Sequence, residues 1–165
     1  MLQARQASEI ENVSKQVLLA LTQRLDGDTV DAKVTAEQMR DPLEVLCKNQ
    51  TENPLFAAVL SFANAVLGQK DSALKGAERA VILSPSNKDR LDGPGFEEIQ
   101  ALIQTMVGEN NRAIPTLTRL LQTPYLSLFY RQIPITPALL RLDPVWDLLR
   151  SDPAFQKLAA EPPAK

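Results

Sequence analysis

The chain has 165 residues, 44% of them hydrophobic and 23% charged, which is the composition of one globular domain rather than of a disordered chain. Eighteen Lys and Arg residues face twenty Asp and Glu residues, and this net charge of −2 excludes the strong positive field expected of a nucleic-acid-binding or membrane-surface protein. The chain has no histidine, which excludes Ser-His-Asp triads and histidine-ligated zinc, and the single cysteine, Cys47, excludes an internal disulfide and a cysteine cluster for a metal.

Helical patterns dominate the chain from its first segment onward, and strand patterns are nearly absent. In the first segment, five apolar residues recur at spacings of three and four: Ile10, Val13, Val17, Leu21 and Leu25. A capping box formed by Ser8 and Glu11 predicts that this helix begins near residue 8. In chain order, the predicted helices cover residues 8–25, 29–40, 42–49, 54–67, 71–83, 94–107, 111–121, 137–141, 144–150 and 153–160, with an irregular proline-rich segment at 122–136.

Proline marks the start of many of these predicted helices. Six dipeptides place a proline directly after a residue suited to a helix start: Asp41-Pro42, Asn53-Pro54, Gly93-Pro94, Thr136-Pro137, Asp143-Pro144 and Asp152-Pro153. A proline costs little at the first helical position, because its missing N–H would have no helical partner there. The prolines are therefore predicted to begin helices, and Asp41-Pro42 is predicted to separate two of them.

One spacing recurs along the chain and indicates a repeat. Three glycines, 41 and 40 residues apart, are each followed five residues later by an alanine: Gly27 and Ala32, Gly68 and Ala73, Gly108 and Ala113. Glycine closes a helix in the left-handed conformation, and alanine lets two antiparallel helices approach closely. A helix–Gly–helix–Ala unit at this period predicts an array of helical repeats.

The middle unit has the residue spacing of a tetratricopeptide repeat, through Leu60, Ser61, Gly68, Ala73, Ala77, Ala80 and Pro85. The chain therefore resembles the tetratricopeptide repeat family, although Ala57 and Asn64 stand where that family usually has Trp and Tyr. The third unit follows the pattern through Ala101, Gly108, Ala113, Leu117 and Leu120, and the first through Leu19, Ala20, Gly27, Ala32 and Met39. The resemblance implies an all-α fold of antiparallel helix pairs stacked as a short right-handed superhelix.

Two further segments, 86–94 and 139–155, resemble the C-terminal repeat region of large bacterial signalling proteins that carry a kinase, cyclase, DNA-binding or TolB-like region ahead of the repeats. This resemblance covers roughly residues 50–160. It implies that the chain is a C-terminal piece of a longer protein or a stand-alone relative. Separately, the single thiol and the lack of a signal-peptide pattern at the start lead us to expect a cytoplasmic protein or the cytoplasmic part of a larger one.

We expect a single α-helical repeat domain over residues 1–165. Its predicted parts are a divergent first helix pair or N-terminal cap at 1–50, repeats at 51–92 and 93–124, and a proline-rich C-terminal cap at 125–165. In this cap, Trp146, Leu149 and Phe155 are expected to cover the exposed end of the last repeat, which has no neighbour to bury its apolar face. The dense apolar stretch at 125–137 must either pack on the core or meet a partner.

By the resemblance, partners bind a concave face lined by the first helix of each pair. The residues implied for that face are Val17, Leu21, Phe62, Val66, Glu98, Leu102 and Met106. They are mostly apolar, which suits an apolar or amphipathic helix in a groove, while the alternative interpretation places some of them in the core.

The predicted function is a non-catalytic protein–protein interaction or scaffolding module, regulatory in role, with a protein or peptide as its partner. The alternative is a homodimerisation element of a larger bacterial signalling protein. We predict no catalytic, metal or cofactor residues and no nucleic-acid partner. Because no run of 18 apolar residues occurs, we also predict no membrane insertion.

Overall fold

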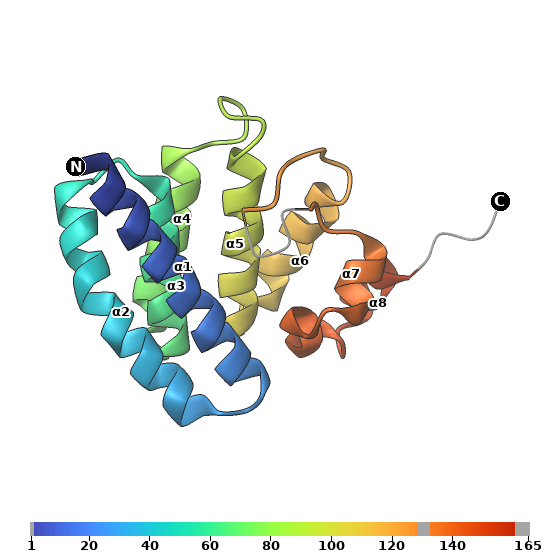
Figure 1. The fold of residues 1–165 in the computed structure, drawn as a ribbon. Coiled ribbons are helices and arrows are strands. Elements are labelled where there is room, and N and C mark those ends of the chain that lie inside the picture. Colours follow the sequence, from blue (N-terminus) through green and yellow to red (C-terminus); the bar gives the residue numbers. More distant parts are fainter. Residues whose placement is uncertain (1, 129–132, 161–165) are drawn as a thin grey trace.

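The structure is a computed structural model that describes residues 2–128 and 133–160, with side chains from residue 11 onward. Within these residues all regular elements are helices, which confirms the all-α prediction (Figure 1). They are α1 (Leu2–Leu25), α2 (Thr29–Asn49), α3 (Pro54–Val66), α4 (Lys70–Leu83), α5 (Gly93–Met106), α6 (Asn110–Leu120), α7 (Pro137–Leu142), the 3₁₀ helix η1 (Pro144–Leu149) and α8 (Pro153–Ala159).

The first six helices form three consecutive hairpins, α1–α2, α3–α4 and α5–α6. In each hairpin, three residues connect two helices that pack closely against each other. Successive hairpins also touch, because α2 packs on α3, α4 packs on α5, and the first helices α1, α3 and α5 contact one another in turn. The hairpins therefore stack in chain order, as Figure 1 shows from the blue end of the chain to the orange part.

The three hairpin turns have the same geometry. Gly27, Gly68 and Gly108 adopt positive φ angles of 82°, 77° and 79°. After each glycine, the next residue donates its N–H to the carbonyl five residues back at 2.8 Å, in the pairs Asp28–Gln23, Gln69–Asn64 and Glu109–Gln104. This bond closes a Schellman motif, which requires the left-handed conformation that glycine adopts without a Cβ penalty. The recurring glycine therefore ends the first helix of each pair, as the spacing predicts.

Small residues let the two helices of each hairpin approach closely. The predicted alanines Ala32, Ala73 and Ala113 are 0–1% exposed. In the middle hairpin, the Ser61 hydroxyl donates to the Ala73 carbonyl at 2.7 Å. A Cβ added to Gly76 would lie only 2.9 Å from the Ser61 Cβ, so the two backbones leave no room for larger side chains there.

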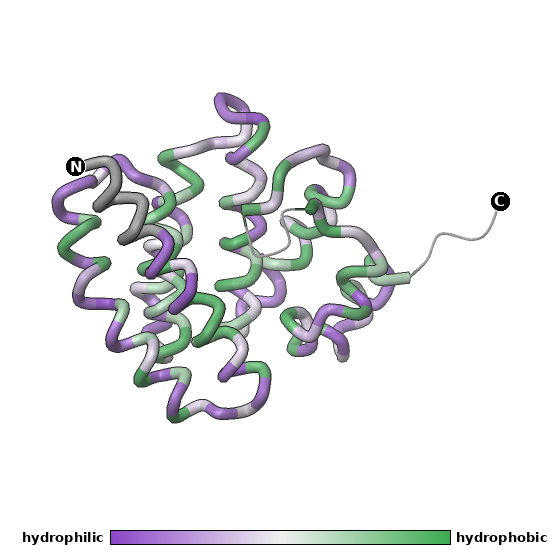
Figure 2. The backbone as a smooth tube through the Cα atoms, viewed as in Figure 1, coloured by the Kyte–Doolittle hydropathy of each residue, from purple (hydrophilic) through white to green (hydrophobic). Residues whose placement is uncertain are grey.

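Two predicted helix boundaries are wrong. The first helix begins at Leu2 rather than near residue 8, and Pro42 lies inside one continuous helix instead of starting a new one. A proline within a helix costs about 3 kcal/mol, through a lost hydrogen bond and a clash with the preceding turn. Here Pro42 is exposed, while the nearby Met39 and Leu43 are 1% and 0% exposed. Burial of a continuous apolar stripe therefore outweighs the local cost of the proline, and Figure 2 shows hydrophobic and hydrophilic residues alternating along this helix.

The C-terminal helices pack against the third hairpin. Trp146, Leu149 and Phe155 are 1%, 0% and 1% exposed, with η1 packed on α5 and α8 on α6. The side chains of Asp143 and Asp152 accept backbone N–H bonds at the starts of η1 and α8, directly before a proline in each case. The Asp-Pro dipeptides thus begin these two short helices, as predicted.

Candidate functional site

The residues predicted to line a concave binding face are in or beside the hydrophobic core. Five of the seven are 2–5% exposed: Leu21, Phe62, Val66, Glu98 and Leu102. The other two, Val17 and Met106, are half-buried and pack against the core. A partner segment cannot reach the five buried side chains without displacing other parts of the chain, so the structure favours the core interpretation for them.

The chain itself covers part of this face. The Tyr125 hydroxyl donates to the Glu98 carboxylate at 3.0 Å and accepts the Ile135 backbone N–H at 3.2 Å. Tyr125 and Ile135 are 7% and 3% exposed, so much of the apolar segment after α6 packs back on α5. Leu126 and Ile133 remain about half exposed. Phe129 and Tyr130, which belong to the same predicted stretch, lie outside the described residues.

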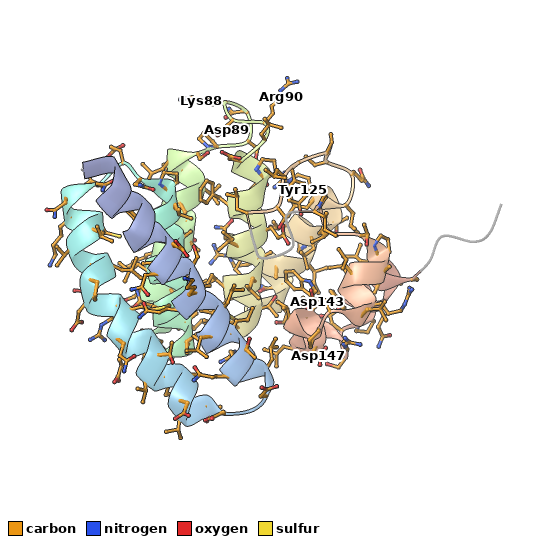
Figure 3. The ribbon with its side chains drawn as sticks, viewed as in Figure 1. Lys88, Asp89, Arg90, Tyr125, Asp143 and Asp147 are labelled. Atoms are coloured by element: carbon orange, nitrogen blue, oxygen red, sulfur yellow. The ribbon has the colours of Figure 1, made fainter. Side chains whose placement is uncertain are left out.

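An apolar groove lies beside this segment and is the candidate functional site. Its volume is about 740 Å³, and it runs between the α4–α5 loop and residues 123–126. The lining residues are Ser86, Arg90, Leu91, Pro94, Thr123, Pro124, Tyr125 and Leu126. Leu91 is 68% exposed and Leu126 is 49% exposed, so two large apolar side chains face solvent at the groove. Figure 3 shows Lys88, Asp89 and Arg90 at the tip of the loop and Tyr125 below them.

Hydrogen bonds to one carboxylate shape the loop wall. Oδ1 of Asp89 accepts the backbone N–H of Asp92 at 3.0 Å and that of Leu91 at 3.2 Å, and Oδ2 accepts the Ser84 hydroxyl at 3.2 Å. The bond from the Asp92 N–H is the main cause of a pKa for Asp89 below the ordinary aspartate value, and the bonds from Leu91 and Ser84 add to it. The Asp89 carboxylate is therefore committed to the loop and not to the groove.

Close backbone approaches fix both walls against the start of α5. A Cβ on Gly93 would lie 2.7 Å from the Ser86 backbone, and a Cβ on Gly95 would lie 2.6 Å from the Leu128 side chain and 3.0 Å from the Leu126 carbonyl oxygen. The two walls also meet directly, since the Leu126 N–H donates to the Leu91 carbonyl at 3.4 Å. The Gly93-Pro94-Gly95 sequence thus serves as a close-packing element, with no strand before it that would make it a phosphate loop.

A partly buried ion pair lies next to the same region. Glu97 is 9% exposed, accepts the Ser86 hydroxyl at 2.6 Å, and pairs with the Arg119 guanidinium of α6. Ser86 lines the groove, so this network links the loop to the third hairpin. The groove is therefore formed by restrained backbone rather than by a freely moving loop.

The groove has the chemistry of a binding surface. Its lining is mainly apolar, and its one charged residue, Arg90, makes no ion pair within the part of the chain whose side chains are described. Within residues 11–128 and 133–160, no group of three or more Cys, Asp or Glu side chains is arranged to hold a metal ion. None of the described helices combines the length and the hydrophobicity that crossing a membrane requires.

Sequence reasoning missed this groove because its two walls are about thirty residues apart and neither has a helical period. The segment at 86–94 and the apolar stretch at 125–137 were each singled out in the sequence, but no local pattern shows that they meet. The close spacing of Gly93 and Gly95 was the available signal, because glycines at a helix start permit close approach of other backbone.

A scan against protein-family models finds no match for the chain, and searches of curated proteins and of solved structures find none either. The similarity to tetratricopeptide repeats and to bacterial signalling proteins therefore remains a prediction from the sequence.

Proposed function

We propose that this protein is a non-catalytic protein-interaction module that binds an extended segment of a partner protein in the groove between residues 86–94 and 123–126. The observation that carries the proposal is an apolar groove with restrained walls, at which Leu91 and Leu126 are exposed. Arg90 lies beside them and has no ion-pair partner among the side chains that the structure describes. Grooves of several hundred Å³ that are lined mainly by apolar side chains with a few polar groups are the usual form of binding sites. A protein that binds a partner without catalysing a reaction would act as a scaffold or as a regulator of that partner.

The chemistry of the groove defines the partner segment. The apolar lining favours one or two aliphatic or aromatic side chains, and Arg90 favours a carboxylate next to them. The neighbouring carboxylate, Asp89, is occupied by loop N–H groups and does not neutralise Arg90 directly. We therefore expect a short peptide in which an acidic residue is adjacent to an apolar one. A nucleic acid does not fit, because Tyr125, the aromatic residue of the lining, is only 7% exposed and offers no stacking face.

A displayed library of random twelve-residue peptides, selected on the full chain, tests the proposal. We expect enriched peptides to share an acidic–apolar motif and to lose at least about tenfold in affinity on Leu91→Asp or Arg90→Glu, measured by fluorescence polarisation. Leu148→Asp is the matched control, because Leu148 is similarly exposed at 55% but lies on η1. No enrichment, or equal binding to the groove variants and the wild type, would show that the groove is not a peptide site.

A second candidate function is self-association through the first hairpin. Six large apolar residues of α1 and α2 are 41–70% exposed: Leu18, Leu19, Leu25, Val30, Val34 and Val45. Light scattering across a concentration series decides this candidate. A mass near 18.2 kDa at all concentrations excludes it, whereas a dimer mass that Leu19→Asp abolishes and Leu91→Asp does not would support it.

A further inference from the structure

A second, smaller cavity lies between the end of α2 and the middle hairpin. Its volume is about 120 Å³, close to that of cavities that bind small organic molecules. The lining residues are Cys47, Gln50, Thr51, Asn53, Ala57, Leu60, Asn64, Ser72, Gly76 and Arg79. None of these is acidic, and burial raises the pKa of the Cys47 thiol, so the thiol is protonated near neutral pH. Arg79 is therefore the one charged group that lines the cavity.

The first hairpin has a side-chain hydrogen bond that is missing at this place in the middle hairpin. Two positions can be compared between hairpins: the one four residues before the turn glycine and the one eight residues after it. In the first hairpin these positions hold Gln23 and Thr35, and in the middle hairpin they hold Asn64 and Gly76. In the first hairpin the Thr35 hydroxyl donates to the Gln23 side-chain oxygen at 2.8 Å. Both middle-hairpin counterparts are shorter, so this bond has no equivalent and the cavity opens between them.

Asn64 is the polar group that this difference leaves without a partner. Its side chain is 8% exposed, lines the cavity, and makes no hydrogen bond with any residue that the structure describes. The Asn64 amide is not one of the fully enclosed polar groups without a partner, so water or a ligand in the cavity can reach it and hydrogen-bond to it.

The third hairpin identifies the chemistry of such a ligand. In this hairpin, Glu97 lies eleven residues before the turn glycine and Arg119 lies eleven residues after it. The two side chains form an ion pair, and the Arg119 side chain is 50% exposed. The same positions of the middle hairpin hold Ala57 and Arg79. Arg79 is equally placed, at 53% exposure, but Ala57 offers no carboxylate. The middle hairpin thus retains the guanidinium of this pair and lacks its anion.

Arg79 is only partly satisfied by its other neighbours. Its guanidinium donates to the Thr51 carbonyl at 2.6 Å, and the Glu52 carboxylate, which is 82% exposed, lies 3.7 Å away. A guanidinium has five N–H donors, so donors remain for a ligand in the cavity.

We propose that this cavity binds a small carboxylate ligand, which takes the place that the Glu97 side chain has in the third hairpin. The carboxylate pairs with Arg79 and accepts from the Asn64 amide, while the hydrocarbon part of the ligand lies against Ala57 and Leu60. The volume admits a ligand of about five non-hydrogen atoms, such as propionate. This site is separate from the peptide groove and does not depend on it.

The test is a titration of the ¹⁵N-labelled chain with propionate, followed by two-dimensional NMR, with propionamide as the neutral isostere. We expect saturable shifts at the Asn64 side-chain amide and at the Gly76 and Cys47 backbone amides, with a dissociation constant of about 1–10 mM, and at least about tenfold weaker binding of propionamide. Arg79→Gln should weaken propionate binding by about tenfold or more, because it removes the charge. Arg112→Gln, which removes an exposed charge of α6 that pairs with Glu78, is the matched control and should leave the affinity unchanged.

Ala57→Glu gives a second, constructive test. The variant recreates the Glu97–Arg119 pair in the middle hairpin, so the new carboxylate should fill the cavity and abolish propionate binding. No saturable shift up to about 100 mM propionate, shifts that propionamide reproduces at the same affinity, or undiminished binding to Arg79→Gln would each overturn the proposal. If Ala57→Glu fails to fold, the Arg79→Gln and propionamide comparisons still decide the question.

Discussion

Trp146 provides the sharpest test of the capping role assigned to the C-terminal helices. Its indole is 1% exposed on η1, which packs against α5. Removing a fully buried aromatic side chain costs about 3–5 kcal/mol, so Trp146→Ala should lower the free energy of unfolding by that amount. The indole Nε1–H is buried without a partner among the described residues. Trp146→Phe should therefore cost only about 1 kcal/mol, because the lost packing is partly offset by removal of an unsatisfied donor.

Urea denaturation, followed by circular dichroism, measures the free energy of unfolding of both variants. The dependence of this free energy on urea concentration is compared with that of the wild type, because a different slope would indicate a change in the unfolded or native state. Leu148→Ala is the control on the same 3₁₀ helix, where a side chain that is 55% exposed should change stability by less than about 0.5 kcal/mol. A loss below about 1 kcal/mol for Trp146→Ala would refute the argument that this helix covers the end of the array.

Three further predictions concern the hairpins and the groove loop. Gly68→Ala should lower the stability of the fold by about 1–2 kcal/mol through backbone strain alone, because φ is 77° and an added Cβ meets no atom within 4 Å. An unchanged melting temperature in thermal melts would contradict the turn geometry. Ala73→Leu should overpack the hairpin by about 1–3 kcal/mol, since Ala73 is 0% exposed, and a neutral effect in the same melts would argue against close helix approach. Hydrogen bonds from the Asp92 and Leu91 N–H groups lower the pKa of Asp89 in the folded state. The stabilisation that these bonds provide is therefore present above the unfolded-state pKa of Asp89, and it is lost as the pH falls through the folded-state pKa. The Leu91 amide shift should therefore titrate with a midpoint below the ordinary aspartate pKa, and a midpoint at or above that value would exclude the loop bonding.

Local signals in the sequence were sufficient for most of the helices. Asp143 and Asp152 cap helices where a proline follows, because the side-chain acceptor and the fixed proline φ act within a single turn. Asp41-Pro42 presents the same local pattern and yet lies inside α2. The difference is tertiary: Met39 and Leu43 are buried on one continuous stripe, and a dipeptide pattern does not contain that information.

The functional surface was less accessible to sequence reasoning than the fold. Repeat spacing placed Phe62 and Leu102 on one face of the array, but spacing does not reveal what covers a face. The covering contacts near this face, such as that between Tyr125 and Glu98, join residues 27 positions apart through a segment without helical period. The groove at Leu91 and Leu126 is also a meeting of two irregular segments, so neither its position nor its exposure follows from local pattern.

The repetition within the chain offers a different route to function, because equivalent positions in the three hairpins act as controls for one another. A site needed only for stability should be satisfied in every copy, as the turn at Gly27, Gly68 and Gly108 is. The position of Glu97 differs between copies, since the third hairpin has the Glu97–Arg119 pair and the middle hairpin has Ala57 beside Arg79, which lines a cavity. The third hairpin shows that a glutamate fits this fold at that position, so packing alone does not require the alanine. The carboxylate site that we propose in the middle hairpin therefore rests on a difference between copies that packing does not impose.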